Sequence, residues 1–177
     1  RLTFGGRNQF PIWTPDGRRV VYSRRGNGVD LAWIAADGSG PAESLLVAPA
    51  DQWAGTFTPD GRTLVFRAGG SAGGDKRHLG YIRLDGERSP QELLRSTAFD
   101  NHSPALSPDG HWVAYVSDES GRAEVYVRPF PGPGGRAQVS NGGGTEPRWS
   151  PSEREIFYRN GNAMMQASVR TQPGFAV

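Results

Sequence analysis

A Pro-Asp-Gly turn between two short apolar runs recurs along the chain, and this repeat constrains the fold more than any other feature. Three copies read WTPDGRRVVYSRR, FTPDGRTLVFRA and LSPDGHWVAYVS, and a fourth, WSPSEREIFYRN, has Ser-Glu in place of Asp-Gly. The repeat proline stands at Pro15, Pro59, Pro108 and Pro151, so the intervals are 44, 49 and 43 residues. A period of about 40 to 45 residues is typical of one four-stranded blade of a β-propeller.

The columns around the repeat proline share their chemistry as well as their spacing. Large apolar residues stand two positions before it, at Trp13, Phe57, Leu106 and Trp149. Aromatic residues stand seven positions after it, at Tyr22, Phe66, Tyr115 and Tyr158. A single sheet of this size buries too few side chains to offset the backbone entropy lost on ordering, so neighbouring sheets must pack face to face. We therefore predict that both columns belong to the core of the blades.

The Pro-Asp-Gly sequences have the residue types of a hairpin turn. Proline fixes φ near −65° at the first central position of a type I turn, aspartate tolerates the second, and glycine takes the left-handed conformation that follows. Such turns commonly connect two antiparallel strands. The predicted turns are Pro15-Asp16-Gly17, Pro59-Asp60-Gly61 and Pro108-Asp109-Gly110, with a less favourable version after Pro151. The aspartates are thus interpreted as scaffold.

Two further apolar segments follow the hairpins and complete a four-stranded unit. The third segments are DLAWIAADG, LGYIRLDG, EVYVRPF and AMMQASV, and the fourth are ESLLVA, QELLR and AQVS. We predict an all-β propeller region of four consecutive four-stranded antiparallel blades, over residues 8–48, 52–96, 101–141 and, incomplete, 145–177. RLTFGG resembles AQVSNGGG, so residues 1–4 are expected to be the last strand of a preceding blade. Together with the missing initial Met, this favours a fragment of a larger, six- to eight-bladed ring over a closed four-bladed one.

Composition excludes several classes of function. The net charge is +2 and the basic residues are scattered among 18 acids, whereas a nucleic-acid groove needs clustered positive charge. Cysteine is absent, which excludes disulfides and thiolate metal sites. No run approaches the roughly 18 apolar residues of a membrane helix, so we expect no direct membrane insertion of this segment.

The motifs that could carry catalysis are weak. GGSAG over residues 69–73 matches a nucleophile elbow with Ser71 as nucleophile, but that chemistry needs a strand, a sharp turn and then a helix. The following sequence, GDKRHLGYIRLDG, reads as a loop and another strand, which favours a connecting loop. The histidines His78, His102 and His111 lack zinc-ligand spacing. We expect no catalytic residue, cofactor or metal in this chain.

One column varies in chemistry where the others do not. Six residues before the repeat proline stand Gln9, Trp53, His102 and Thr145. We expect these residues in the loops that enter the first strands, around one mouth of the central channel. Binding tends to reside in loops that differ on a constant scaffold. Trp53 is the best candidate anchor for a partner, and the alternative is that it caps the core between blades.

The repeats resemble the WD-repeat-like propeller blades of the TolB group, on the residues TPDGRRVVYSRR, SPDGHWVAYVSDESGRAEVYV and EPRWSPSEREIFYRNGNAMM. The C-terminal part, from YVRPFPGPGG to QPGFAV, is similar to the propeller behind many bacterial membrane-anchored serine/threonine protein kinases. That resemblance implies a non-catalytic sensing or scaffolding module with a protein or peptide partner, joined to further blades and located outside the cytoplasm or in the periplasm.

Two alternatives remain open within the same resemblance. Prolyl-oligopeptidase-type serine peptidases carry similar blades, which filter access to a catalytic serine elsewhere in the chain. TolB-like periplasmic partner-binding proteins are the third possibility. No His-Arg-Asp or Asp-Phe-Gly kinase signature is present in this chain. All three readings imply that this segment binds or gates and does not catalyse.

Overall fold

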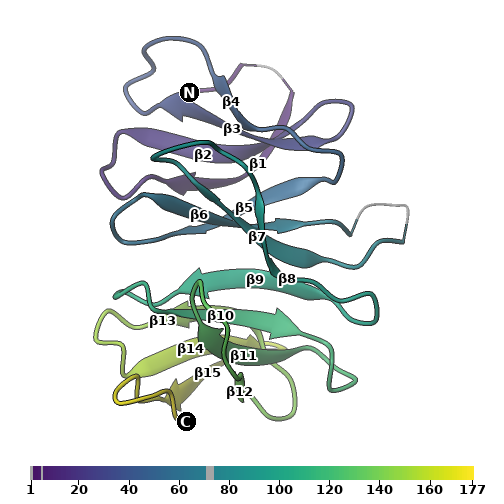
Figure 1. Cartoon of the computed structure of the whole chain (residues 1–177), viewed down its shortest axis with the longest axis vertical. Coiled ribbons are helices and arrows are strands. Elements are labelled where there is room, and N and C mark those ends of the chain that lie inside the picture. Colours follow the sequence, from purple (N-terminus) through teal and green to yellow (C-terminus); the bar gives the residue numbers. More distant parts are fainter. Residues whose placement is uncertain (1, 5, 71–73) are drawn as a thin grey trace.

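The computed structural model describes residues 2–4, 6–70 and 74–177, and these form fifteen strands without a helix. The strands make four antiparallel sheets, which we call sheets A to D. The sheets are stacked in chain order along the long axis, with the two termini at opposite ends (Figure 1). The predicted all-β architecture of consecutive antiparallel blades is thus confirmed.

Within each sheet the strands pair in the order of the sequence. Sheet A contains β1 (Arg7–Trp13), β2 (Arg19–Arg25), β3 (Val29–Ala35) and β4 (Glu43–Leu46). Sheet B contains β5 (Gln52–Phe57), β6 (Thr63–Ala68), β7 (His78–Arg83) and β8 (Gln91–Leu94). Sheet C contains β9 (Asn101–Leu106), β10 (Trp112–Ser117), β11 (Glu124–Pro129) and β12 (Ala137–Gln138). Sheet D contains β13 (Thr145–Trp149), β14 (Glu155–Asn160) and β15 (Ala163–Ser168).

The sheets converge on their first strands. β1 contacts β5, β5 contacts β9, and β9 contacts β13, whereas the fourth strands make no comparable contacts with one another among the described residues. Sheets that touch at one edge and spread at the other are wedges around an axis, as in a propeller. The first strands therefore line the inner side. Residues 2–4 belong to no strand of the described chain, so their membership of another blade stays a prediction.

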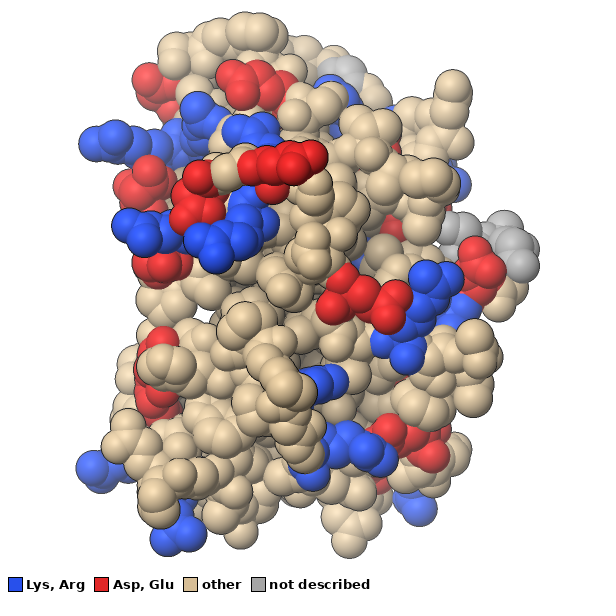
Figure 2. All heavy atoms as spheres, in the orientation of Figure 1, with Lys and Arg blue, Asp and Glu red and all other residues tan. Residues whose placement is uncertain are grey.

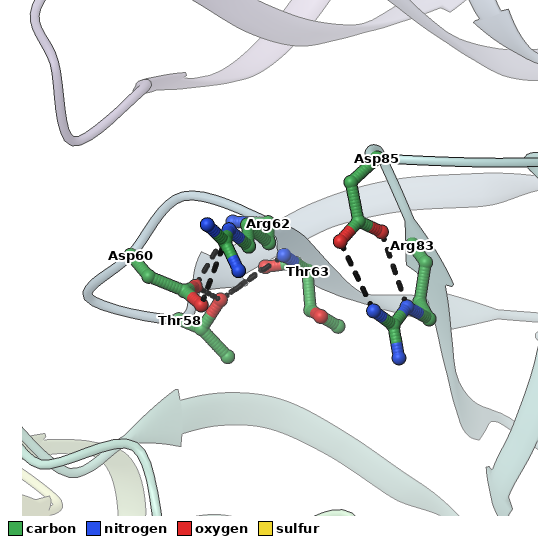
Figure 3. Close-up of polar contacts among 6 residues, drawn as sticks. All are labelled: Thr58, Asp60, Arg62, Thr63, Arg83 and Asp85. Carbon is green, nitrogen blue, oxygen red and sulfur yellow. Dashed lines mark hydrogen bonds and ion pairs between the residues drawn. The ribbon is translucent and has the colours of Figure 1, made fainter.

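The turn between β5 and β6 shows how the repeated motif works (Figure 3). The Gly61 N–H donates to the Thr58 carbonyl at 2.9 Å, which closes the turn, and Gly61 has φ 70°. The Thr58 hydroxyl donates to the Asp60 carboxylate at 2.6 Å and accepts from the Thr63 N–H at 3.0 Å. The Arg62 N–H donates to the same carboxylate at 3.0 Å. The hydrogen bond from the Thr58 hydroxyl, and to a lesser degree the one from the Arg62 N–H, lower the pKa of Asp60. The Asp60 carboxylate thus makes its hydrogen bonds within its own turn.

The same bonds recur around Asp16 and Asp109 in sheets A and C. In the fourth turn the Glu153 N–H donates to the Ser150 carbonyl at 3.1 Å, and Glu153 takes the position of the glycine with φ 61°. A side chain in this left-handed conformation costs about 1–2 kcal/mol. The fourth turn therefore keeps the shape of the others at a cost in backbone strain.

The turns also contact one another between sheets. A Cβ placed on Gly61 would lie 3.5 Å from the Pro15 ring, and one on Gly110 would lie 3.0 Å from the Pro59 ring. The proline of one turn thus lies against the glycine of the next. These contacts form a row along one side of the stack, because the same turn is repeated in adjacent sheets.

Both columns face the preceding sheet. Phe66 packs with sheet A, Tyr115 with Leu79 of sheet B, and Tyr158 with sheet C. Trp13 departs from the prediction that its whole column is core, because 62% of its surface is exposed. The column points toward a preceding sheet, and sheet A, which comes first in the stack, has none on that side.

Candidate functional site

The four residues of the variable column lie inside first strands and not in the loops before them, which corrects the sequence-based placement. Gln9 is in β1, Trp53 in β5 and His102 in β9, and Thr145 begins β13. Each strand pair shifts register just after this column, between Gln9 and Ile12 in sheet A and at the matching places in the others. Bulges of this kind bend a strand and redirect the side chains beside them.

Strained backbone marks the same bulges in three of the four sheets. Phe10, Ser103 and Glu146, which follow the column residue directly, have φ of 51°, 52° and 54°. Left-handed backbone at residues other than glycine costs of order 1–3 kcal/mol and is concentrated at functional sites. In sheet B the neighbouring chain approaches Gly55 closely instead. A Cβ at Gly55 would lie 2.7 Å from both the Pro104 ring and the Val65 carbonyl oxygen.

Trp53 carries an arginine on its ring. The Arg67 guanidinium carbon lies 3.5 Å from the Trp53 ring centroid, and the two residues are direct partners across β5 and β6. A cation stacked on tryptophan contributes about 0.5–2 kcal/mol, depending on its exposure. Both side chains are half-buried. Burial, followed by the nearby Arg77, lowers the pKa of Arg67 to about 10, so this guanidinium stays charged at neutral pH.

His102 lies on the neighbouring sheet and shares Arg67 as an electrostatic neighbour. Its Nδ1 is 2.9 Å from the Ser103 hydroxyl oxygen. Burial lowers the pKa of His102 to about 4, and the positive charges of Arg77 and Arg67 add to that effect. The imidazole is therefore neutral at pH 7 and offers hydrogen bonding without charge.

The acids around this site are already hydrogen-bonded. Asp100 forms a 3.1 Å ion pair with Arg77 and accepts the Arg77 backbone N–H at 2.6 Å. Asp118 accepts the Asp100 N–H at 2.7 Å, and Asp51 accepts the Val29 N–H at 2.8 Å. These bonds fasten the loops before β3, β7 and β9. Asp100 and Asp118 thus have a structural role in these loops.

The loop before Thr145 is fixed by a buried acid that the sequence did not indicate. Glu124 is 1% exposed, and its Oε1 accepts the N–H groups of Gly142 and Gly143 at 2.9 and 2.8 Å. Its Oε2 accepts the Ser140 hydroxyl at 2.5 Å, and that hydroxyl oxygen accepts the Val125 N–H at 2.7 Å. An acid at the start of a strand carries no local signal of burial, because its partners lie about 16 to 19 residues away.

The structure brings together two members of the variable column. Trp53 stacks on Arg67, and the charge of Arg67 lowers the pKa of His102 on the adjacent sheet, while no contact joins Gln9 or Thr145 to them among the described residues. Thr145 instead donates its hydroxyl to the Arg159 carbonyl at 3.4 Å. Arg67 cannot be recognised from the sequence because it stands on a second strand, one position after the aromatic column. The signal that could have found it is its cross-strand register with Trp53.

The other sequence candidates do not assemble into a catalytic site. Ser71 lies outside the described residues. His78 lines a cavity of about 450 Å³ between sheets A and B, and His111 is at the surface, 3.1 Å from Asp109. The described part of the chain contains no group of three or more residues that could hold a metal ion. In the same part, no helix is long and apolar enough to span a membrane.

Charges of both signs are interspersed on the surface. On the face drawn in Figure 2, red and blue side chains gather side by side over the left part of sheets A and B. Arg83 and Asp85, for example, form an ion pair at 3.0 Å beside the β5–β6 turn (Figure 3). A face of mixed sign gives no support for a polyanion such as nucleic acid as partner.

Comparison with known proteins supports the fold and leaves the family unassigned. No family model matches the chain. It is 30% identical to the Tol-Pal system protein TolB of Desulfosudis oleivorans over 83 residues. The matched region covers 47% of this chain and 18% of that protein. It is 27% identical over 159 residues to an uncharacterised protein of Agrobacterium fabrum, which is 82% of this chain and 52% of the relative.

Solved structures show the same arrangement of sheets. TolB from Acinetobacter baumannii superposes with a TM-score of 0.73 at 18% identity, over 93% of this chain and 40% of that one. A TolB-type protein from Agrobacterium tumefaciens gives 0.71 at 16% identity, over 92% and 61%. A prolyl endopeptidase gives 0.66 at 13% identity, over 95% and 28%. The chain thus spans only part of each protein it matches, and its fold is that of TolB-like β-propellers.

Proposed function

We propose that the chain is a non-catalytic β-propeller module that binds a protein or peptide partner at the mouth formed by Trp53, Arg67 and His102. The observation that carries this proposal is the variable column itself. Its chemistry changes from sheet to sheet, while the bulges that hold it are kept at a cost in backbone strain. Different side chains on one repeated scaffold are what a binding face needs.

The resemblance to kinase C-terminal propellers supports a role for this module as the sensor region of a bacterial serine/threonine protein kinase, outside the cytoplasm. Structural similarity to TolB supports partner binding in the same sense. The similarity to a prolyl endopeptidase supports a second candidate, a propeller that gates access to a peptidase domain. The parent gene distinguishes the two candidates. A kinase domain and one membrane helix encoded upstream would support the kinase sensor, and an α/β-hydrolase domain encoded downstream would support the peptidase propeller.

Peptide display tests the binding face directly. A random peptide library is selected on the immobilised chain, and the enriched peptides are titrated against Trp53→Ala and against Trp13→Ala. Trp13 is the matched control, because it is an exposed tryptophan at the opposite end of a first strand. We expect Trp53→Ala to weaken binding by about tenfold or more, as for an aromatic anchor, and Trp13→Ala to leave it unchanged.

Two results would contradict the proposal. Peptides that bind the two variants equally well would place the binding face elsewhere. Hydrolysis of ester or peptide substrates by the chain, lost in Ser71→Ala, would show that it is an enzyme.

A further inference from the structure

Arg67 is a charged group whose counterion is missing from the described chain. It forms no recorded ion pair or hydrogen bond with the described residues, and its Nε is sealed from solvent without a partner. The neighbouring acids are already bound, Asp100 by Arg77 and Asp51 by the Val29 N–H. A half-buried cation without an anionic partner loses part of its hydration without compensation, so a ligand that supplies the anion gains free energy on binding.

The stacking geometry leaves this cation able to receive a ligand. All donors of a guanidinium lie in its plane, so a ring stacked on the face of Arg67 blocks none of them. Nε is the one nitrogen of Arg67 that is both buried and unpaired, which means that the terminal nitrogens reach solvent. Two parallel N–H groups at the edge of an arginine match the two oxygens of a carboxylate.

The local charge selects a monoanion. Two cations and two acids act on this position, because Arg67 is influenced by Arg77, Asp100 and Asp51. A phosphate dianion would place two negative charges near Asp100 and Asp51, whereas a carboxylate places only one. A neutral imidazole at His102 adds a hydrogen-bonding group without further charge.

We propose that Arg67, held on the Trp53 ring, is the receptor for a carboxylate of the bound partner, either an acidic side chain or a chain terminus. This inference rests on the proposed function, since it names the chemical group that the mouth recognises. Trp53 positions the guanidinium and forms the wall of the site, and Arg67 makes the contact.

Sodium acetate is the probe. It is titrated into the ¹⁵N-labelled chain at constant ionic strength, with the Trp53 indole N–H signal as readout and acetamide as the neutral isostere. For a ligand this small we expect saturation below about 100 mM acetate and no shift with acetamide. Arg67→Gln should weaken acetate binding by about tenfold or more, because the bond to the charged donor is lost. Arg62→Gln is the matched control, an exposed arginine in the β5–β6 turn.

The imidazole of His102 gives a second readout in the unmodified chain. It faces Arg67 on β6, Arg77 before β7, Asp100 before β9 and Asp118 after β10. Acetate bound at Arg67 offsets one of the two positive charges, so it should raise the pKa of His102 measured by NMR titration. This measurement needs no variant and therefore does not depend on how Arg67→Gln folds.

Each outcome decides between the proposals. A shift that does not saturate, an unchanged pKa of His102, equal binding by Arg67→Gln, or tighter binding of inorganic phosphate would overturn the carboxylate site. Selected peptides that require Trp53 but ignore Arg67→Gln would leave the proposed function standing and refute this inference. Acetate binding with no enriched peptide would support the site and refute partner binding at the mouth.

Discussion

Removal of the buried carboxylate of Glu124 is the sharpest test of how the loop before β13 is held. In Glu124→Ala, three donors lose their acceptor, the N–H groups of Gly142 and Gly143 and the hydroxyl of Ser140. An unsatisfied donor costs about 1–3 kcal/mol, depending on its burial. The two glycine N–H groups lie near the surface and can bond to water instead, so the cost of each is at the low end of this range. Ser140 is 1% exposed, so the cost of its unsatisfied hydroxyl is higher.

The expected loss is therefore about 3–4 kcal/mol of the free energy of unfolding. Glu124→Gln keeps the side-chain volume and one acceptor oxygen, so we expect about half of that loss. Urea denaturation followed by circular dichroism measures both values. Glu92→Gln is the control, because Glu92 is an exposed acid paired with Arg95 at 3.6 Å, and such pairs contribute about 0–1 kcal/mol.

A loss within about 1 kcal/mol for Glu124→Ala would refute the reasoning, since it would mean that water replaces the carboxylate without penalty. A loss in Glu92→Gln as large as in Glu124→Gln would also refute it, because the effect would then follow charge and not burial. The loop that these bonds hold leads directly into Thr145 at the start of β13.

Three further predictions concern the repeat and the site. Glu153→Gly should stabilise the fold by about 0.5–1 kcal/mol in urea denaturation, because glycine takes the left-handed conformation without strain; destabilisation would contradict the role given to φ there. Trp149→Ala should lower the free energy of unfolding by about 2–4 kcal/mol, because it removes a packed ring and a 3.0 Å hydrogen bond from the indole N–H to the Ala105 carbonyl. Trp13→Ala should lower it by less than about 1 kcal/mol. Equal losses would show that the two ends of the stack are equally covered. Since burial lowers the pKa of His102 from 6.5 to about 4, the unfolded chain binds its proton more tightly, and stability should fall as the pH drops through this window. After allowance for partial exposure, the expected loss of stability across this window is about 1–3 kcal/mol. His102→Gln should flatten the slope of stability against pH. An unchanged slope in the variant would assign the pH dependence to other groups.

Local chemistry explains what could be predicted from the sequence. The turn residues act within six positions of one another, so the Pro-Asp-Gly motif and the spacing of Pro15, Pro59 and Pro108 indicate hairpins, sheets and their number. The exposure of Trp13 could not be predicted in this way, because it depends on whether a neighbouring sheet covers that face. The Arg67–Trp53 stack depends on strand register, and the burial of Glu124 depends on a loop that folds back onto it.

The row of turns has a consequence for how such a molecule grows. Two such contacts are present, Pro15 against Gly61 and Pro59 against Gly110, so the turn of sheet B presents its glycine to sheet A and its proline to sheet C. The contact is directional and joins unlike surfaces, so a repeat with the Pro-Asp-Gly turn carries both halves of the contact. Duplicating one repeat therefore extends the array without redesigning its neighbours. In a propeller that closes into a ring, the number of blades then depends on the angle between adjacent sheets, and selection can adjust that angle independently of the residues on the first strands.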